Sequence, residues 1–209
     1  MSSPSTDTSG PARPLGKRER TKQANREEIL RAAIEAFTEL GFGATTVRDI
    51  VRRTTLASGT FYNYFPDKDA ILHEIAAEHV READERMQAA RATARTPAEA
   101  VERGAAAYFG ILVERPDLLA LFRRNSGSLR AFADDALLHV VVDALRDDLD
   151  RLGAGATTPL DTELLAAGLI GAGMEIAMRF AERGGQDPTA ALAALRALVV
   201  DGVLGRIAD

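Results

Sequence analysis

The chain has 209 residues, of which 46% are hydrophobic and 27% charged, the composition of a globular protein that can bury a sizeable core. It has no cysteine, which excludes a disulfide scaffold and thiolate chemistry and fits a reducing cytoplasm. Its net charge is −5, unevenly divided: residues 1–68 carry 11 Lys and Arg against 8 Asp and Glu, and residues 69–209 carry 15 against 23. The basic end can therefore approach nucleic acid while the acidic body stays away.

The first twenty residues are rich in Ser, Pro, Thr and Gly and contain no apolar run. We expect residues 1–20 to form a disordered basic tail. Without the hydrophobic segment of a secretory signal, a cytoplasmic protein is expected. Four basic residues precede the first helix: Lys17, Arg18, Arg20 and Lys22. They can follow DNA phosphates or enter a minor groove. The alternative is an ordinary run of solvated charges.

Apolar residues at helical spacing predict a first helix from about Lys22 to Leu40. Two short helical patterns joined by a tight polar turn follow in residues 45–65. Thr46 and Asp49 can form a capping box at the first of them, and Ser58 can cap the second. Three helices of this size form a minimal helix-turn-helix head.

The outer side of the second short helix carries hydroxyls, an amide and a small residue. They are Ser58, Gly59, Thr60, Tyr62, Asn63 and Tyr64. Such groups can donate to phosphate oxygens and base edges, and Gly59 lets the backbone come close to a phosphate. The alternative is an ordinary helical hairpin whose tyrosines cover the core.

The fourth predicted helix, from about Lys68 to Ala92, links the head to the body. Asp67 can cap it, but Lys68 in the first turn opposes the helix dipole, an objection that a nearby phosphate would remove. His73 and His79 suggest a zinc site at first sight, but the two histidines of a zinc HExxH motif are four positions apart, on one face of a helix. His73 and His79 are six positions apart and therefore lie on nearly opposite sides of the helix. We therefore expect no metal site.

The body is helical in pattern, which gives an all-α fold of about nine helices. A fifth helix follows Thr96-Pro97, a short sixth starts at Pro116-Asp117, and a seventh covers about Leu129 to Leu152, with His139 on its solvated side. The last two helices, about 164–180 and 190–204, are apolar nearly all round. A body of this size covers only one of their sides, so a homodimer through these helices is expected. A membrane span is disfavoured, because the uncharged run from Leu164 to Met174 has only 11 residues before the charged Glu175 and Arg179 interrupt it.

The segments FTELGFGATTVRDI and SGTFYNYFPDKDAIL resemble the DNA-binding domain of the TetR family of one-component transcriptional regulators, over about residues 21–75. The resemblance implies a DNA-binding domain at 21–68 and a ligand-binding and dimerisation domain at 69–209. It implies two heads on a palindromic operator, with half-sites about 34–36 Å apart or a multiple of that. On this basis the expected DNA-binding residues are Thr46, Arg48, Ser58, Gly59, Thr60, Tyr62, Asn63, Tyr64 and Lys68, and the basic run before the first helix adds Lys17 and Arg18.

The resemblance also places an effector pocket among the fifth to eighth helices. The candidate lining residues there are Tyr108, Phe109, Leu112, Phe122, Phe132, Val140, Met174, Glu175 and Met178. Most of these residues are equally suited to simple core packing, and Glu175 can instead form an i,i+4 ion pair with Arg179 or meet a symmetry partner. The apolar, lightly aromatic set favours an aliphatic or acyl-like effector.

The resemblance implies a ligand-responsive transcriptional repressor. It has no nucleophile elbow, phosphate loop or zinc set, so neither an enzyme nor a cofactor is expected. The alternative is a helical ligand-binding or scaffold protein that has lost sequence-specific DNA binding. The retained Thr60, Tyr62, Tyr64 and Lys68 argue against this alternative.

Overall fold

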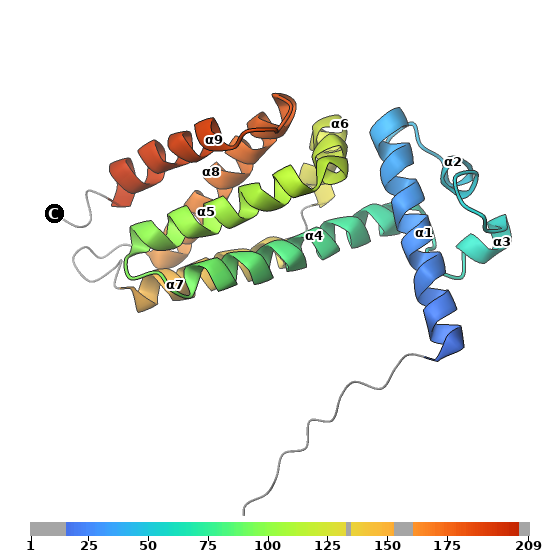
Figure 1. Cartoon of the computed structure of the whole chain (residues 1–209), viewed down its shortest axis with the longest axis horizontal. Helices are drawn as coiled ribbons and strands as arrows, with labels where there is room; N and C mark the ends of the chain where they lie inside the picture. Colours follow the sequence, from blue (N-terminus) through green and yellow to red (C-terminus); the bar gives the residue numbers. More distant parts are fainter. Residues whose placement is uncertain (1–15, 133–134, 153–160, 205–209) are drawn as a thin grey trace, which may run out of the picture.

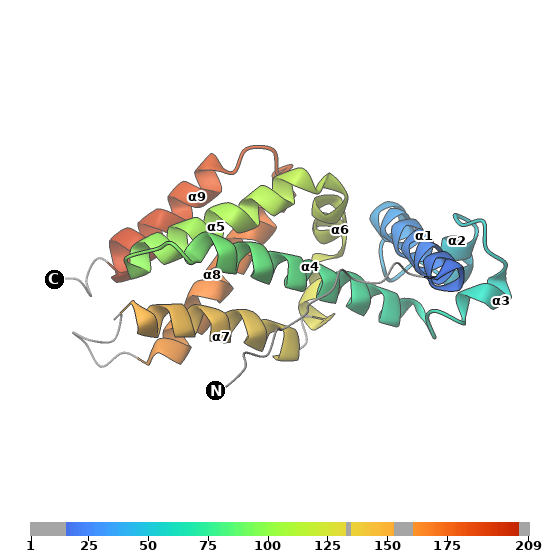
Figure 2. The same cartoon turned by 60° about the horizontal axis from the view of Figure 1, so that its bottom comes forward.

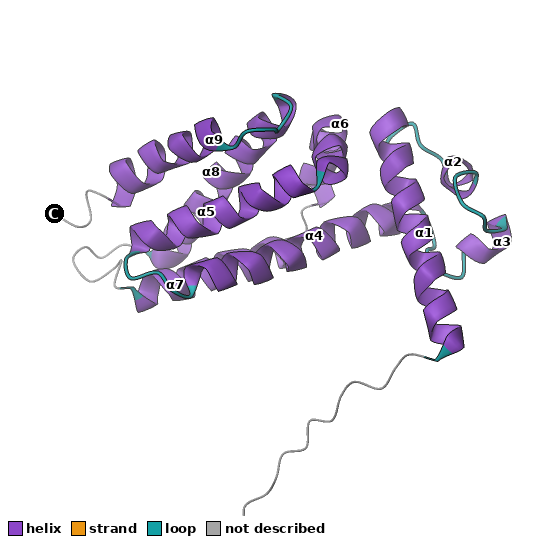
Figure 3. Cartoon of the chain, in the orientation of Figure 1, coloured by secondary structure: helices purple, strands orange, loops and turns teal. Residues whose placement is uncertain are grey.

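The computed structural model describes residues 16–132, 135–152 and 161–204. Within these ranges all regular secondary structure is helical, with nine α-helices and a short π-helical segment at the end joined by turns and loops, and no strand (Figures 1 and 3). A small head of three helices lies at one end, and the remaining helices form an elongated body (Figure 1). The predicted all-α architecture is confirmed.

The head consists of α1 (Lys17–Leu40), α2 (Val47–Val51) and α3 (Ser58–Phe61). Its core contains Phe37 from α1, Ile50 from α2 and Phe61 from α3, all fully buried. Two boundaries differ from expectation. The first helix begins at Lys17, so residues 17–20 are helical and not part of a disordered tail, whereas residues 1–15 lie outside the described residues.

The third helix is also shorter than predicted, and Ser58 does not cap it. Ala57 is the N-cap residue, without a side-chain hydrogen bond, and the helix ends at Phe61. The chain continues in turns, in which the N–H groups of Tyr64 and Phe65 both donate to the carbonyl of Phe61. This turn keeps Phe65 in the core, so the inward face predicted for the segment is correct although the helix is not continuous.

Helix α4 (Lys68–Arg91) belongs to both parts of the molecule, as Figures 1 and 2 show. The side chain of Asp67 caps it by accepting from the N–H of Ala70 at 2.8 Å, as predicted. Ile71, Leu72 and Ile75 in its first two turns are buried in the head core. The later turns pack in the body, so a single rigid element joins the two.

The body contains α5 (Pro97–Glu114), α6 (Pro116–Phe132), α7 (Asp135–Arg151), α8 (Thr162–Glu182) and α9 (Thr189–Leu195), which runs into a π-helical segment, Arg196–Leu204. Helix α6 is longer than predicted and is kinked at Asn125, whose φ of −124° and ψ of 25° are not helical. The seventh helix starts at Asp135 and not near Leu129, because α6 occupies the intervening residues. His139 is exposed, as expected.

Helix α8 is the one element in the described part of the chain that is long and apolar enough to cross a membrane by length and composition alone, which is weak evidence by itself. Its buried face packs against α6, α7 and α9. The rest of the helix is exposed or half-buried, and its exposed residues include Leu164, which is 71% exposed, and Met174. Leu198, after α9, is 55% exposed. The uncovered apolar side expected for the last two helices is therefore present.

Candidate DNA interface and ligand pocket

The helix-turn-helix segment is held by local hydrogen bonds that the sequence predicts. Thr46 Oγ1 accepts from the N–H of Asp49 at 3.3 Å, and Asp49 Oδ2 accepts from the N–H of Thr46 at 2.9 Å, which completes the capping box at α2. The hydrogen bond that Thr46 Oγ1 donates to Asp49 Oδ2, followed by the one from the Thr46 N–H, holds the pKa of the Asp49 carboxyl below its ordinary value. The hydroxyl of Thr46 is therefore committed to the helix.

Most of the residues expected to read DNA lie on the outside of the head. Exposed side chains or backbone are found at Arg48, Ser58, Gly59, Tyr62 and Asn63, and Thr60 is half-buried. Tyr62 is 60% exposed although it is large and apolar over most of its surface. No Cβ contact closes off Gly59, so its backbone is accessible. The structure thus brings this part of the predicted set together around α2 and α3.

Lys68 has a role that sequence reasoning missed. Its ammonium group donates to the backbone carbonyls of Phe42 at 2.7 Å, Thr45 at 2.8 Å and Gly43 at 3.3 Å, and it lies 4.5 Å from the centre of the Phe42 ring. Three acceptors match the three N–H bonds of an ammonium group. The α1–α2 turn, and not a phosphate, therefore satisfies Lys68 at the start of α4.

Tyr64 and Arg53 are likewise engaged within the head. The Tyr64 hydroxyl accepts from Asn25 Nδ2 of α1 at 3.0 Å, and the residue is half-buried. Arg53 donates to the carbonyl of Asp49 at 2.8 Å and pairs with Glu39 at 2.5 Å. These contacts fix the position of the helix-turn-helix on α1. Lys17 and Arg18 are exposed in the first turn of α1, on a helix and not on a flexible arm.

Glu28 positions the turn between α2 and α3, a role for which the sequence gives no signal. Its carboxylate accepts from the N–H of Thr55 at 2.5 Å and from the Thr55 hydroxyl at 3.2 Å. The bond from the Thr55 N–H, followed by the one from the hydroxyl, lowers the pKa of Glu28. A separation of 27 residues hides this contact from any local pattern.

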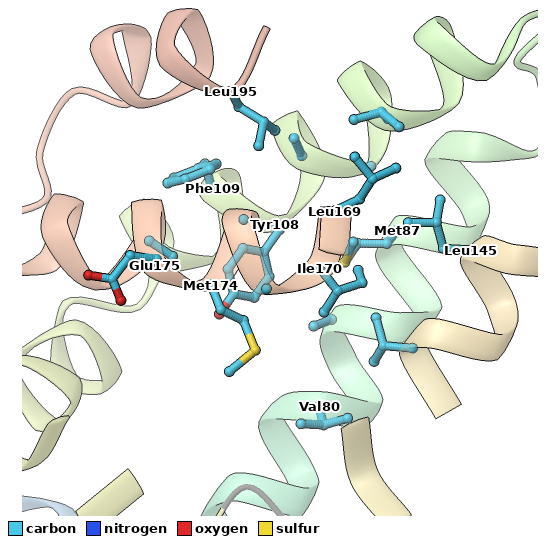
Figure 4. A pocket seen from close by; sticks show the side chains of 18 of the residues that line it. Val80, Met87, Tyr108, Phe109, Leu145, Leu169, Ile170, Met174, Glu175 and Leu195 are labelled. Carbon is cyan, nitrogen blue, oxygen red and sulfur yellow. The ribbon is translucent and has the colours of Figure 1, made fainter. Parts of the chain in front are cut away.

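The body encloses a cavity of about 410 Å³ between α4, α5, α7 and α8, within the usual size range of small-molecule sites. Figure 4 shows apolar side chains from several helices gathered around it, among them Met87, Leu145, Leu169 and Ile170. Residues of α4 at helical spacing form one wall: Ala76, His79, Val80, Ala83, Met87 and Arg91. The helix that enters the head core therefore also lines the pocket.

Six of the nine residues predicted to bind a ligand line this cavity. They are Tyr108, Phe109, Phe122, Met174, Glu175 and Met178. Leu112 is instead buried in a core cluster beside it, and Val140 is 51% exposed while its neighbour Val141 lines the pocket. The side chain of Phe132 lies outside what the structure describes. None of the predicted pocket residues lies on α4, because the sequence indicates α4 only as a mechanical link between head and body.

His79 and Tyr108 form a polar pair in this apolar wall. His79 Nε2 lies 3.4 Å from the Tyr108 hydroxyl, and the imidazole packs against the Phe122 ring. Burial, with a smaller contribution from the charge of Arg115, lowers the pKa of His79 to about 4, and burial raises the pKa of Tyr108 to about 12. Both groups are therefore neutral at physiological pH.

His73 is exposed, and no three metal-ligating side chains cluster within the described ranges.

Glu175 lines the pocket from α8 and is exposed. It accepts from Arg179 Nε at 3.1 Å, and Arg179 also pairs with Glu182 at 3.0 Å. The i,i+4 ion pair considered from the sequence is present. At this exposure such a pair contributes little to stability.

A three-helix unit with an uncovered polar face around its short second and third helices, set on a helical body with an apolar pocket, defines a helix-turn-helix protein. Residues 29–75 match the family model for bacterial regulatory proteins of the TetR family. Over these residues the chain is therefore similar to the bacterial regulatory proteins of the TetR family.

Comparison with known proteins agrees with this assignment. The HTH-type transcriptional repressor KstR2 of Rhodococcus jostii is 38% identical over 72 residues, 34% of this chain and 30% of that protein. A TetR-family transcriptional regulator of Pectobacterium atrosepticum of solved structure is 27% identical, with a TM-score of 0.66 over 91% of this chain and 97% of that one.

The transcriptional regulator FadR of Bacillus subtilis, solved in complex with stearoyl-CoA, has a TM-score of 0.71 over 85% of this chain and 98% of that one. Its identity of 24% shows a common fold alone. The chain spans 26% to 48% of the length of the first four curated relatives that it matches.

Proposed function

We propose that this protein is a cytoplasmic, ligand-responsive transcriptional repressor that binds a palindromic operator as a homodimer and is released by a small effector with a large apolar part. The observation that carries the proposal is the double role of α4. Ile71, Leu72 and Ile75 are buried in the head core, and His79, Val80 and Met87 on the same helix line the pocket. A ligand that changes the position of α4 changes the position of the head.

The DNA-binding surface in this proposal comprises Arg48, Ser58, Gly59, Thr60, Tyr62 and Asn63, with Lys17 and Arg18 at the start of α1. Arg48, Gly59 and Asn63 approach base edges, and the hydroxyl groups contact phosphates. Thr46, Tyr64 and Lys68 act from behind this surface, since their polar atoms hold α2, α1 and the α1–α2 turn. The head, residues 21–68, and the body, residues 69–209, then divide DNA binding from effector binding and dimerisation.

The dimer in the proposal forms through α8, α9 and the segment after α9. This choice is supported by the exposure of Leu164 and Leu198 and by Gly168 and Gly171, beside which a Cβ would meet nothing within 4 Å. Small residues allow helices of two copies to approach closely. Two heads related by a two-fold axis read two half-sites, and the effector acts by favouring a head spacing that does not fit them.

The test is selection of bound duplexes from random and genomic DNA by the purified protein, repeated across salt concentrations. Enrichment of a palindrome, with affinity that falls steeply with salt, is the expected result. A single unrepeated half-site would contradict dimeric reading. Failure to enrich any sequence at low salt would contradict the proposal and favour a helical ligand-binding protein without sequence-specific DNA binding.

A further inference from the structure

Arg91, the last residue of α4, is the most deeply buried charged side chain among those described. It is 1% exposed, and its Nε donates to Asp148 Oδ2 of α7 at 2.7 Å. Nη1 and Nη2 are buried and have no hydrogen-bond partner within the described part of the chain. Guanidinium N–H groups that are buried without acceptors are strongly disfavoured, and such groups in native proteins commonly mark a functional role.

The charges around Arg91 leave an excess of one positive charge. Asp148 Oδ1 accepts from Arg151 Nη2 at 2.7 Å, so one carboxylate serves two guanidinium groups. Burial raises the pKa of Asp148, but the hydrogen bonds from Arg151 and Arg91 outweigh it, and the pKa is held below its ordinary value. Asp148 is therefore ionised, and it is the only carboxylate within ion-pair distance of Arg91 among the described residues. Arg151 is half exposed and solvated, whereas the two remaining Arg91 nitrogens are buried and would be satisfied by a further acceptor.

Arg91 lines the cavity, and its side chain packs against Gly104 of α5. A Cβ on Gly104 would lie 3.5 Å from Arg91 Nη1 and 3.4 Å from its Cδ, so Arg91 fits closely beside a glycine that also lines the cavity. From Arg91 the α4 wall continues through Met87, Ala83 and Val80 to His79. At a helical rise of 1.5 Å per residue, the twelve residues from His79 to Arg91 span about 18 Å. One end of this wall carries the guanidinium group, and apolar side chains follow it.

We propose that the effector is an amphipathic monocarboxylate, such as a free medium- or long-chain fatty acid. Its carboxylate binds the two unpartnered nitrogens of Arg91, and its apolar tail lies along α4 toward His79 and Tyr108. A guanidinium fork matches a carboxylate in a bidentate arrangement, and the low polarity of the site strengthens the pair. This inference rests on the proposed function only in naming this ligand as the effector.

The carboxylate end distinguishes this ligand from its close chemical relatives. A methyl ester or an alcohol of the same length has the same tail but no charge for Arg91. An acyl thioester likewise has no carboxylate at the end of its chain. The tail alone would bind all of them similarly, whereas the proposed anchor selects the acid.

The experiment measures binding of dodecanoate, methyl dodecanoate, dodecanol and dodecanoyl-CoA to the full-length protein by titration calorimetry, below the micelle-forming concentration of each. We expect dodecanoate to bind at least about tenfold more tightly than the ester and the alcohol, as charge-assisted hydrogen bonds are the stronger kind. Equal binding of acid and ester, or preference for the thioester, would overturn the proposal. This comparison uses the native protein and does not depend on the folding of any variant.

Two variants locate the anchor. Arg91→Met should reduce dodecanoate affinity at least about tenfold and change dodecanol affinity by less than about twofold, because it removes the fork and keeps an apolar side chain of similar length. Arg91→Lys should give an intermediate affinity. Arg103→Met, on the exposed side of α5, is the matched control and should behave as the native protein. Unchanged dodecanoate binding in folded Arg91→Met protein would overturn the assignment.

Operator binding separates this inference from the proposed function. If the selected DNA is released by dodecanol or the thioester as readily as by dodecanoate, the repressor proposal stands and the carboxylate anchor is wrong. If no DNA is enriched but dodecanoate binds through Arg91, the anchor is correct and the regulatory function is wrong.

Discussion

The side chain of Asn125 in the body holds the end of a helix in the head. Its Oδ1 accepts from the N–H of Phe42, just after α1, at 2.6 Å, and its Nδ2 donates to the carbonyl of Phe37 at 3.1 Å. Asn125 also donates to Leu121 of its own helix, where the backbone departs from helical geometry. Besides the continuous α4, this buried amide is therefore a direct polar link between body and head.

Replacement of Asn125 should loosen this link. We expect Asn125→Ala to lower the free energy of unfolding by about 1–3 kcal/mol, because it leaves the buried N–H of Phe42 and the carbonyl of Phe37 without this partner. Urea unfolding followed by circular dichroism measures the change. Arg123→Ala, an exposed position two residues earlier, should change it by less than about 0.5 kcal/mol. Equal stabilities of the two variants would show that the link contributes nothing.

Lys68 should act on stability and not on DNA affinity. Lys68→Met removes the donor to the carbonyls of Phe42 and Thr45, so we expect a loss of about 1–3 kcal/mol in the free energy of unfolding. The slope of log affinity against log salt should stay unchanged. Lys22→Met, at an exposed position of α1, is the control for stability. A slope that becomes shallower by about 1 without loss of stability would restore the phosphate contact expected from the sequence.

The sequence predicts the local features of the head well, because they depend on neighbours in the chain. The capping pair of Thr46 and Asp49 and the cap at Asp67 follow from spacing alone. The contacts of Lys68 with Phe42, of Glu28 with Thr55 and of Asn125 with Phe42 join residues 26, 27 and 83 positions apart. No periodic pattern encodes such pairs, so the roles of these three side chains required the folded chain.

The same limit applies to the pocket. Aromatic and methionine residues on α5, α6 and α8 can be chosen as candidates by type, and Tyr108, Phe122 and Met174 among them line the cavity. Arg91 could not be chosen as a pocket residue in this way, because an arginine at the end of a helix is normally a solvated cation that complements the helix dipole. Only the packing of α5 and α7 around it makes Arg91 buried and its two Nη atoms unpartnered.

Two exposed arginines, Arg48 in α2 and Arg52 just after it, should affect DNA binding differently. In the proposed interface Arg48 approaches a base edge, so Arg48→Ala should reduce discrimination at one base pair by about 1–3 kcal/mol. Arg52→Ala, which removes a charge from the C-cap position of α2, should weaken binding to all sequences and make the salt slope shallower by about 1. Competition binding with single-base operator variants across salt concentrations measures both. Identical specificity profiles for native protein and Arg48→Ala would remove Arg48 from the base-reading set.

His79 should make stability depend on pH in the acidic range. Its pKa is about 4 in the folded state, against an ordinary value of 6.5. Between these values the unfolded chain binds a proton that the folded chain does not, so stability falls as the pH drops from about 6.5 to 4. The contribution is on the order of 3 kcal/mol.

The measurement compares urea unfolding of native protein and His79→Leu at pH 7.5 and pH 4.5. The native protein should lose more stability than the variant over this interval, since the other titrating groups are common to both. His73→Leu, at an exposed position of the same helix, should follow the native protein. Parallel losses in native protein and His79→Leu would show that the imidazole is not buried in the neutral form.

The exposed apolar side of the last helices predicts the outcome of charge insertion there. Leu164→Glu and Leu198→Glu place a carboxylate where the proposed dimer buries a leucine, and an unpaired charge at such an interface is strongly disfavoured. We expect each variant to be a folded monomer in sedimentation experiments. Each should lose most of its operator affinity, because a single head reads only one half-site.

Val113→Glu is the matched control, since Val113 is also an exposed apolar residue, 40% exposed, but lies on α5. It should stay dimeric and bind the operator as the native protein does. A dimer that persists in both leucine variants would place the interface elsewhere on the body. Loss of dimerisation with full operator affinity would instead contradict the requirement for two heads.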